Sequence, residues 1–92
     1  MLIRWTKPAV DDLTHICDYT VEHFGAAQAR RAAMTICESG ESLRAFPNKG
    51  RLGRKPNTRE LGIPRLPFAA VYRLRAGAIE IDRILHGAQE WP

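Results

Sequence analysis

The sequence has few of the features that mark secreted, membrane-spanning or metal-binding proteins. Its N-terminus, MLIRWTKP, reaches charge and proline after three apolar residues, and no run of about 18 apolar residues follows. It holds two cysteines, Cys17 and Cys37, which we expect to be reduced and buried as small apolar residues. No Cys and His spacing typical of a zinc site is present. We therefore predict a cytoplasmic protein without a membrane span, a metal ion or a cofactor.

Length and composition predict one globular domain over residues 1–92. A chain of 92 residues can bury one modest core and no second one. Its 45% hydrophobic and 26% charged residues are typical of folded domains, and no low-complexity segment or linker divides it.

Charge is unevenly distributed along the chain. The formal net charge is +4, but nine basic residues and a single acid, Glu60, lie between Arg44 and Arg75, a segment of net charge +8. These basic residues are Arg44, Lys49, Arg51, Arg54, Lys55, Arg59, Arg65, Arg73 and Arg75. The rest of the chain carries five basic and nine acidic residues. Such segregation favours an anionic partner, either nucleic acid or an acidic protein segment, although a merely solvated face is the alternative.

Two helices are predicted in the first half. Thr6 is a good N-cap and Pro8 fits a first turn, so we expect a helix over residues 8–24 that ends at Gly25. A second helix is predicted over residues 26–46, before Pro47. Its stripe of small and apolar residues suits close packing against the first helix as an antiparallel hairpin. The stripe consists of Ala29, Ala33, Ile36, Cys37, Gly40 and Leu43.

Strands are predicted at the start of the chain and in its second half. Residues 2–5 read as a short strand, and a basic loop over residues 48–58 precedes a strand over residues 59–63. Residues 68–75 and 79–86 flank Ala76-Gly77 in the pattern of a β-hairpin, with a broken alternation that favours a β-bulge or burial on both faces. The predicted fold is α+β with the order β-α-α-β-β-β. The helical hairpin covers one face of a small, mostly antiparallel sheet, and the other face is partly open.

Two stretches of the second half, TRELGIPRLPFAAVYRL and AIEIDRILHGAQEWP, resemble the RelE/ParE family of toxins from bacterial type II toxin–antitoxin systems. The opening WTKPAVDDL is similar to the first helix of that family, so the resemblance covers essentially the whole chain. It implies a toxin of the plasmid-stabilisation type, held inactive by a ParD-like antitoxin whose C-terminal tail wraps the toxin. Contact with DNA is then expected only through the antitoxin.

Two mechanisms divide this family, and the residues favour one of them. RelE-like members are ribosome-dependent mRNA interferases, and cleavage by the 2′-hydroxyl needs a base, an acid and a cation at the phosphate. Ala69 stands where the resemblance places the nuclease arginine, and the tail offers His86 without a tyrosine or arginine. The prediction therefore leans away from an enzyme and towards the ParE-like branch, which inhibits DNA gyrase. If the protein is a nuclease instead, the catalytic candidates are His86, Arg59 and Arg73.

The remaining candidate residues are binding residues. Arginines of the second half are predicted either to form ion pairs within the sheet or to bind acidic side chains of the antitoxin; they are Arg59, Arg65, Arg73, Arg75 and Arg83. His86 and Trp91 are the candidates for contact with the cellular target. For His86 the alternative is a strand-end residue that hydrogen-bonds the following turn, and for Trp91 it is a clamp that returns the tail to the core.

Overall fold

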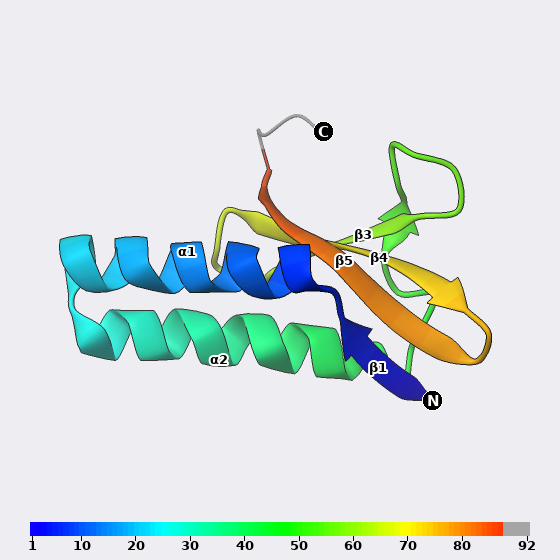
Figure 1. Ribbon diagram of the computed structural model, residues 1–92, viewed down its shortest axis with the longest axis horizontal. Coiled ribbons are helices and arrows are strands. Elements are labelled where there is room, and N and C mark those ends of the chain that lie inside the picture. The colour runs from blue at the N-terminus through cyan, green and yellow to red at the C-terminus, as the bar shows by residue number, and fades with distance from the viewer. Residues whose placement is uncertain (88–92) are drawn as a thin grey trace.

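The computed structural model describes residues 1–87 and confirms the α+β fold (Figure 1). Its elements are β1 (Leu2–Trp5), α1 (Lys7–Phe24), α2 (Ala26–Ser42), β2 (Arg51–Leu52), β3 (Arg59–Gly62), β4 (Phe68–Arg75) and β5 (Ala78–His86). The strands form one sheet in the order β1-β5-β4-β3-β2, in which the β1–β5 pair is parallel and the other pairs are antiparallel. The short strand β2 lies inside the stretch predicted as a loop, so the order gains one strand.

Helix α1 begins where the sequence predicts, because Thr6 serves both the helix and the sheet. Its Oγ1 accepts a hydrogen bond from the Ala9 amide at 3.2 Å and donates one to the Asp82 carbonyl at 2.9 Å. The cap therefore joins the start of α1 to the middle of β5. Gly25 ends the helix with φ of 89°, a conformation that favours glycine. The far end of the hairpin, around Gly25, extends beyond the sheet (Figure 1).

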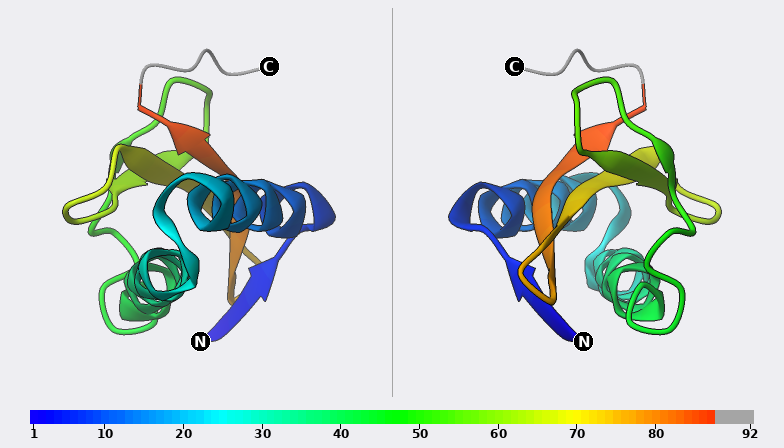
Figure 2. Two further views of the ribbon diagram at one scale, coloured as in Figure 1. Left: turned by 90° about the vertical axis from the view of Figure 1, so that its left-hand side faces the viewer. Right: turned by 90° about the vertical axis from the view of Figure 1, so that its right-hand side faces the viewer.

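Helix α2 ends earlier than predicted, at Ser42 rather than at residue 46. The amides of Leu43 and Arg44 bond to carbonyls three residues back, at 3.2 and 3.0 Å, so the chain tightens into turns before it reaches Pro47. Figure 2 shows the two helices side by side, viewed along their axes. Gly40 faces the sheet: a Cβ there would lie 3.0 Å from Ile81 Cδ1 and 3.2 Å from Trp5 Cζ2. Gly40 was predicted to help α2 pack against α1, and the structure shows that it also lets α2 lie close to the sheet.

The expected burial of both cysteines is wrong. Cys17 is half-buried on α1 and Cys37 is exposed on α2, and both are free thiols. Burial, followed by the charge of Asp18, raises the pKa of Cys17; burial, followed by the neighbouring Cys17, raises the pKa of Cys37. Neither thiol is thus activated as a nucleophile.

One hydrophobic core lies between the helices and the sheet. It is made of Ala9, Ile36, Leu43, Leu61, Ile63, Ala70, Tyr72, Ile79, Ile81 and Ile84, with Ile3, Trp5, Leu13, Ile16, Leu66 and Phe68 packed against it. Ala69, Val71 and Leu85 lie outside this cluster but are also buried. The first half of β4 is therefore covered on both faces, and the open part of the other face lies towards Arg73 and Arg75.

The broken alternation in the last strand is a β-bulge. Val71 pairs with Arg83 and Tyr72 with Ile81, so Asp82 is the extra residue of β5. The bulge brings Ile79, Ile81 and Ile84 to the core face of a strand whose sequence is out of phase. At the other end of the hairpin, Ala76 and Gly77 both have positive φ, at 46° and 78°, as expected for a tight two-residue turn.

Within residues 1–87, no helix is long and apolar enough to cross a membrane. The same residues hold no group of three or more His, Cys, Asp or Glu side chains that could bind a metal ion.

Candidate functional site

Four of the five arginines predicted to bind an antitoxin are engaged within the chain. Arg73 Nε lies 2.6 Å from Asp82 Oδ2, and Arg75 Nε lies 3.8 Å from Glu80 Oε1. Arg59 donates to the carbonyls of Asn48 and Gly50 at 3.3 and 2.8 Å, and Arg83 is paired with Asp12. The structure therefore places these four arginines in structural roles, which leaves their antitoxin contacts a prediction.

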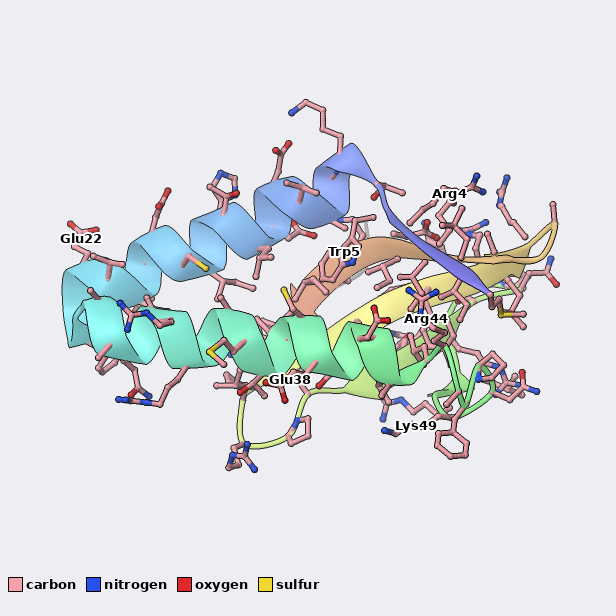
Figure 3. The ribbon with its side chains drawn as sticks, turned by 90° about the horizontal axis from the view of Figure 1, so that it is seen from below. Arg4, Trp5, Glu22, Glu38, Arg44 and Lys49 are labelled. Carbon is pink, nitrogen blue, oxygen red and sulfur yellow. The ribbon has the colours of Figure 1, made fainter. Side chains whose placement is uncertain are left out.

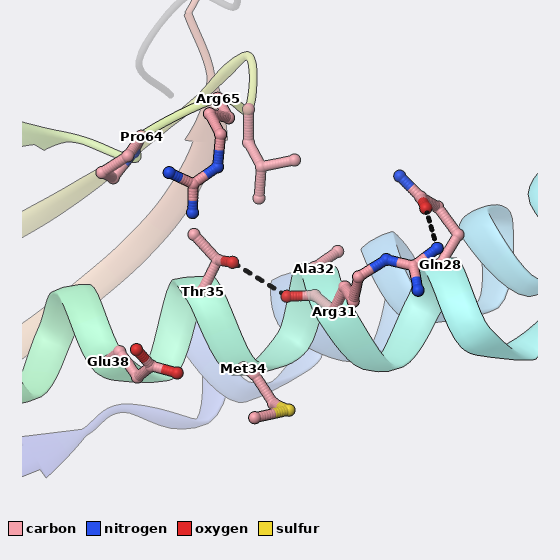
Figure 4. A pocket seen from close by; sticks show the side chains of 9 residues that line it. Gln28, Arg31, Ala32, Met34, Thr35, Glu38, Pro64 and Arg65 are labelled. Carbon is pink, nitrogen blue, oxygen red and sulfur yellow. Dashed lines mark hydrogen bonds between the residues drawn. The ribbon is translucent and has the colours of Figure 1, made fainter.

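Arg65 differs from the other four. It lies in the β3–β4 loop with a positive φ of 64°, is exposed, and has no ion-pair partner among residues 1–87. Its guanidinium points towards Thr35 of α2 (Figure 4). Between this loop and α2 lies a pocket of about 390 Å³, lined by Gln28, Arg31, Ala32, Met34, Thr35, Glu38, Pro64, Arg65 and Leu66. Of the five candidates, Arg65 is the one best placed to meet an incoming carboxylate.

The basic loop is organised by a residue that sequence analysis did not select, Glu60. Its carboxylate is 2% exposed and accepts from Arg51 Nη2 at 3.2 Å and from both the amide and Nε of Arg54 at 3.0 and 3.2 Å. Burial alone would raise the pKa of Glu60, but the hydrogen bonds from Arg54 and Arg51 outweigh it and hold that pKa below its usual value. The sequence feature that could have identified Glu60 is its position as the single acid among the nine basic residues between Arg44 and Arg75.

Tyr72 fixes the start of the same loop. Its buried hydroxyl accepts from the Gly50 amide at 2.9 Å and donates to the Pro47 carbonyl at 2.7 Å. A Cβ on Gly50 would lie 2.8 Å from Tyr72 Cε1, so only glycine allows this approach. Together with Arg59, this tyrosine holds residues 47–50 against the sheet.

A second missed residue is Asp12 of α1. Its carboxylate accepts from Arg83 Nε and Nη2 at 2.7 and 3.0 Å and from the Ile84 amide at 2.9 Å. The hydrogen bonds of this pair raise the pKa of Arg83, which stays charged. Beyond Ile81, β1 no longer pairs with β5, and Asp12 accepts the Ile84 amide that would otherwise lack a partner at this edge.

The residues of a nuclease constellation are not brought together. His86 pairs with Phe68 at one end of β4, and Arg73 lies five residues further along that strand, about 17 Å away at the rise of an extended chain. Arg59 pairs with Tyr72 and so projects from the opposite face to Arg73. Side chains this far apart, and on two faces, do not converge on one phosphate.

His86 itself lies at the end of β5, as predicted. Its ring is exposed and meets Phe68 edge to face, with ring centroids 5.8 Å apart. The next residue, Gly87, donates its amide to the Pro67 carbonyl at 2.7 Å. Ala69, at the position of the nuclease arginine, is buried between Gly62 and Leu85. Trp91 lies outside the described residues.

Comparison with known proteins identifies the family. The model of the "ParE toxin of type II toxin-antitoxin system, parDE" matches residues 3–91. The chain belongs to the ParE toxin family. The predicted resemblance to RelE/ParE toxins is therefore confirmed.

Similar ParE-family and RelE-named proteins cover nearly the whole chain. A protein named putative toxin Y4kP, from Sinorhizobium fredii, is 34% identical over 98% of this chain and 92% of its own. One named toxin RelE2, from Caulobacter vibrioides, is 33% identical over 95% of this chain and 96% of its own. A chain of the chromosomal ParDE toxin–antitoxin system from P. aeruginosa matches with a TM-score of 0.89 and 34% identity, covering 94% of this chain and 95% of that one.

Proposed function

We propose that this ParE-family toxin inhibits DNA gyrase when free. The observation that supports this choice over RNA cleavage is the separation of His86 from Arg59 and Arg73, with a buried alanine at residue 69. Within residues 1–87 the separation of His86, Arg59 and Arg73 favours action by binding, and gyrase is the target that the ParE-like branch implies. The proposed target contacts are His86 and Trp91.

The test is a supercoiling and DNA-cleavage assay with purified gyrase and stoichiometric toxin. We expect supercoiling to be blocked or cleaved DNA to accumulate, and His86→Ala and Trp91→Ala to weaken the effect about tenfold or more. His15→Ala, on the exposed side of α1, is the matched control and should inhibit like the native toxin. Gyrase that keeps full activity in excess toxin would overturn the proposal.

We also propose that a ParD-like antitoxin neutralises this toxin through the helical hairpin and the pocket at Arg65. Large apolar side chains that are about half exposed or more lie on the two helices: Val10, Tyr19, Val21, Phe24 and Met34. Such residues suit an amphipathic partner segment, and Arg65 beside α2 suits an acidic side chain of that segment. Arg65→Glu should weaken the complex in a titration of toxin with antitoxin, whereas Arg4→Glu, exposed on β1 outside the hairpin, should not.

A ribosome-dependent mRNA interferase is the second candidate, and one groove favours it. A depression of about 490 Å³ is lined by Lys49, Arg51 and His86, among other residues, so an imidazole and two cations border one space. Toeprinting on programmed ribosomes decides between the candidates. Cuts in the A-site codon that disappear in His86→Ala would support this second function, and intact mRNA would exclude it.

A further inference from the structure

The face of the sheet away from the core carries arginines on three strands. Ile3 and Trp5 of β1 pack on the core, so Arg4 between them projects to the other side, and Figure 3 shows Arg4 and Trp5 on opposite sides of the strand. Arg73 and Arg75 alternate with Tyr72 on β4 and project the same way. In the sheet register, Arg51 of β2 lies opposite Glu60 of β3, and Glu60 lies opposite Val71 of β4. Because Val71 is outside the core cluster, Arg51 also lies on the face away from the core. We call Arg4, Arg51, Arg73 and Arg75 the arginine face.

The acids of this face lie beneath the arginines. The Glu60 side chain is 2% exposed and its partner Arg51 is 76% exposed. Asp82 is 13% exposed below Arg73 at 26%, and Glu80 is 24% exposed below Arg75 at 57%. Glu60 and Asp82 hold the guanidinium groups of Arg51 and Arg73 by hydrogen bonds, and Glu80 faces Arg75 across 3.8 Å, while the outer ends of the arginines reach solvent.

The arginines keep donors for a further acceptor. Arg73 and Arg75 face their carboxylates through Nε, and within residues 1–87 their Nη groups bond to no other atom. Arg4 is exposed and has no ion-pair partner in the same part of the chain. A guanidinium held through Nε presents its outer N–H groups in a fixed orientation, which suits phosphate oxygens.

The surroundings favour a nucleic acid over an acidic protein. Protein interfaces need an apolar centre, but the apolar residues at the middle of this face, Val71 and Leu85, are at most 1% exposed, and the exposed Leu2 lies at its rim on the edge strand β1. Interfaces with DNA are more polar and more positively charged. The arginines also spread from β1 to β2, about 19 Å across five strands, whereas an extended peptide follows one strand. Phosphates on both strands of a duplex match this spread.

We propose that the arginine face binds the phosphate backbone of duplex DNA directly and without sequence preference. This activity is distinct from the operator contacts expected of an antitoxin and does not depend on gyrase. Lys55 and Arg54 of the adjoining loop add positive charge next to the face. Neutralising about four phosphates gives a slope of log affinity against log salt of about −3.6, or about 150-fold weaker binding at 200 mM than at 50 mM salt.

The experiment measures fluorescence anisotropy of a labelled 20-base-pair duplex with purified full-length toxin and no gyrase. Arg73→Gln with Arg75→Gln should weaken binding about tenfold or more and make the salt slope shallower by about 2. Arg30→Gln with Arg31→Gln on α2 removes the same charge elsewhere and should change affinity less than threefold. Arg4→Gln is a second variant of the same face, and it should also weaken binding of the duplex. Because Arg4 has no ion-pair partner among residues 1–87, its loss should leave the melting temperature unchanged.

Three results would overturn the proposal. One is the absence of binding at 50 mM salt, and another is equal loss of affinity in the α2 control. The third is a labelled poly-glutamate peptide that binds the face while the duplex does not, which would identify an acidic protein segment as the ligand. Because gyrase is absent, none of these results bears on gyrase inhibition.

Discussion

At the scale of single residues, Glu60 shows how a basic segment keeps its shape. Its buried carboxylate accepts three hydrogen bonds from Arg51 and Arg54, so two guanidinium groups that would repel each other are held beside one strand. The residue that organises the basic loop is thus the single acid between Arg44 and Arg75 in the sequence. Asp12 does the same for Arg83 at the edge of β5.

Replacing Glu60 by glutamine should destabilise the fold at neutral pH. Loss of the charge leaves the donors of Arg51 and Arg54 poorly satisfied, at a cost of about 1–3 kcal/mol in the free energy of unfolding. Urea denaturation at pH 7 measures this cost. Glu41→Gln, which removes an exposed partner of Arg44, is the control and should have a much smaller effect.

The same substitution predicts a pH dependence. The pKa of Glu60 is lower in the folded chain than in the unfolded one, so its contribution is complete above the unfolded value of about 4.3 and is lost as pH falls through the folded value. The difference in the free energy of unfolding between native and Glu60→Gln proteins should therefore shrink as the pH falls from about 5 to about 3. A difference that stays constant over this range would contradict the assigned role.

At the scale of elements, one carboxylate docks α1 on the edge of β5. Strand β1 pairs with β5 only as far as Ile81, and beyond it the Ile84 amide and the Arg83 guanidinium both bond to Asp12. Helix α1 thereby takes the place of a continuation of β1 along this edge. Thr6 makes the neighbouring connection, from the helix cap to the Asp82 carbonyl.

Asp12→Ala should therefore loosen α1 from the sheet. The Ile84 amide and Arg83 lose a charged acceptor, and we expect a loss of about 2–3 kcal/mol in the free energy of unfolding. Asp18→Ala, at an exposed position of the same helix, is the control. Hydrogen exchange adds a local measurement: the Ile84 amide should exchange faster in Asp12→Ala, and unchanged protection would show that another group holds this edge.

The basic loop is an element that tolerates no side chain at Gly53. A Cβ there would lie 2.2 Å from Thr58 Oγ1 and 3.0 Å from the Thr58 carbonyl, which accepts the Gly53 amide at 2.8 Å. Gly53→Ala should cost about 1–3 kcal/mol, measured by thermal unfolding. Gly62→Ala on β3, where a Cβ meets nothing within 4 Å, is the matched control and should leave the melting temperature nearly unchanged.

At the scale of the whole molecule, two surfaces of different chemistry are kept apart. The helical hairpin extends beyond the sheet (Figure 1) and carries five of the ten large exposed apolar residues found within residues 1–87. The arginines of the ion pairs with Glu60, Asp82 and Glu80 lie on the sheet and its basic loop. The first surface suits a protein segment and the second suits a polyanion. The two proposals together assign one kind of partner to each of these surfaces.

A separate prediction concerns the exposed apolar residues of the helical hairpin. Val21→Glu with Phe24→Glu places charge on side chains that are 49% and 67% exposed, so the fold should persist while antitoxin affinity falls about tenfold or more. Leu52→Glu, at a 78% exposed apolar residue of β2, is the control and should keep native affinity. Isothermal titration with the antitoxin measures both. Native affinity in the double variant would show that the antitoxin binds elsewhere.

Most of the fold follows from local patterns. Thr6, Pro8 and Gly25 define α1, and the alternation around Ala76-Gly77 defines the β4–β5 hairpin. The end of α2 was not predicted correctly, because it depends on the turns at Leu43 and Arg44. The strand β2 was not predicted, because it depends on its pairing with β3 and on the bonds by which Tyr72 and Arg59 hold residues 47–50. Local propensity carries no information on such long-range bonds.

The sequence by itself determined the family, the order of the elements apart from β2, and the concentration of basic charge between residues 44 and 75. Only the tertiary structure decided what that charge does, because the partners of its arginines are distant in sequence: Glu60 is nine residues from Arg51, and Asp12 is 71 residues from Arg83. It also separated His86 from Arg59 and Arg73, since strand register and the Asp82 bulge set which side chains share a face. Composition shows which charges a chain contains, and pairing geometry determines which of them reach a partner.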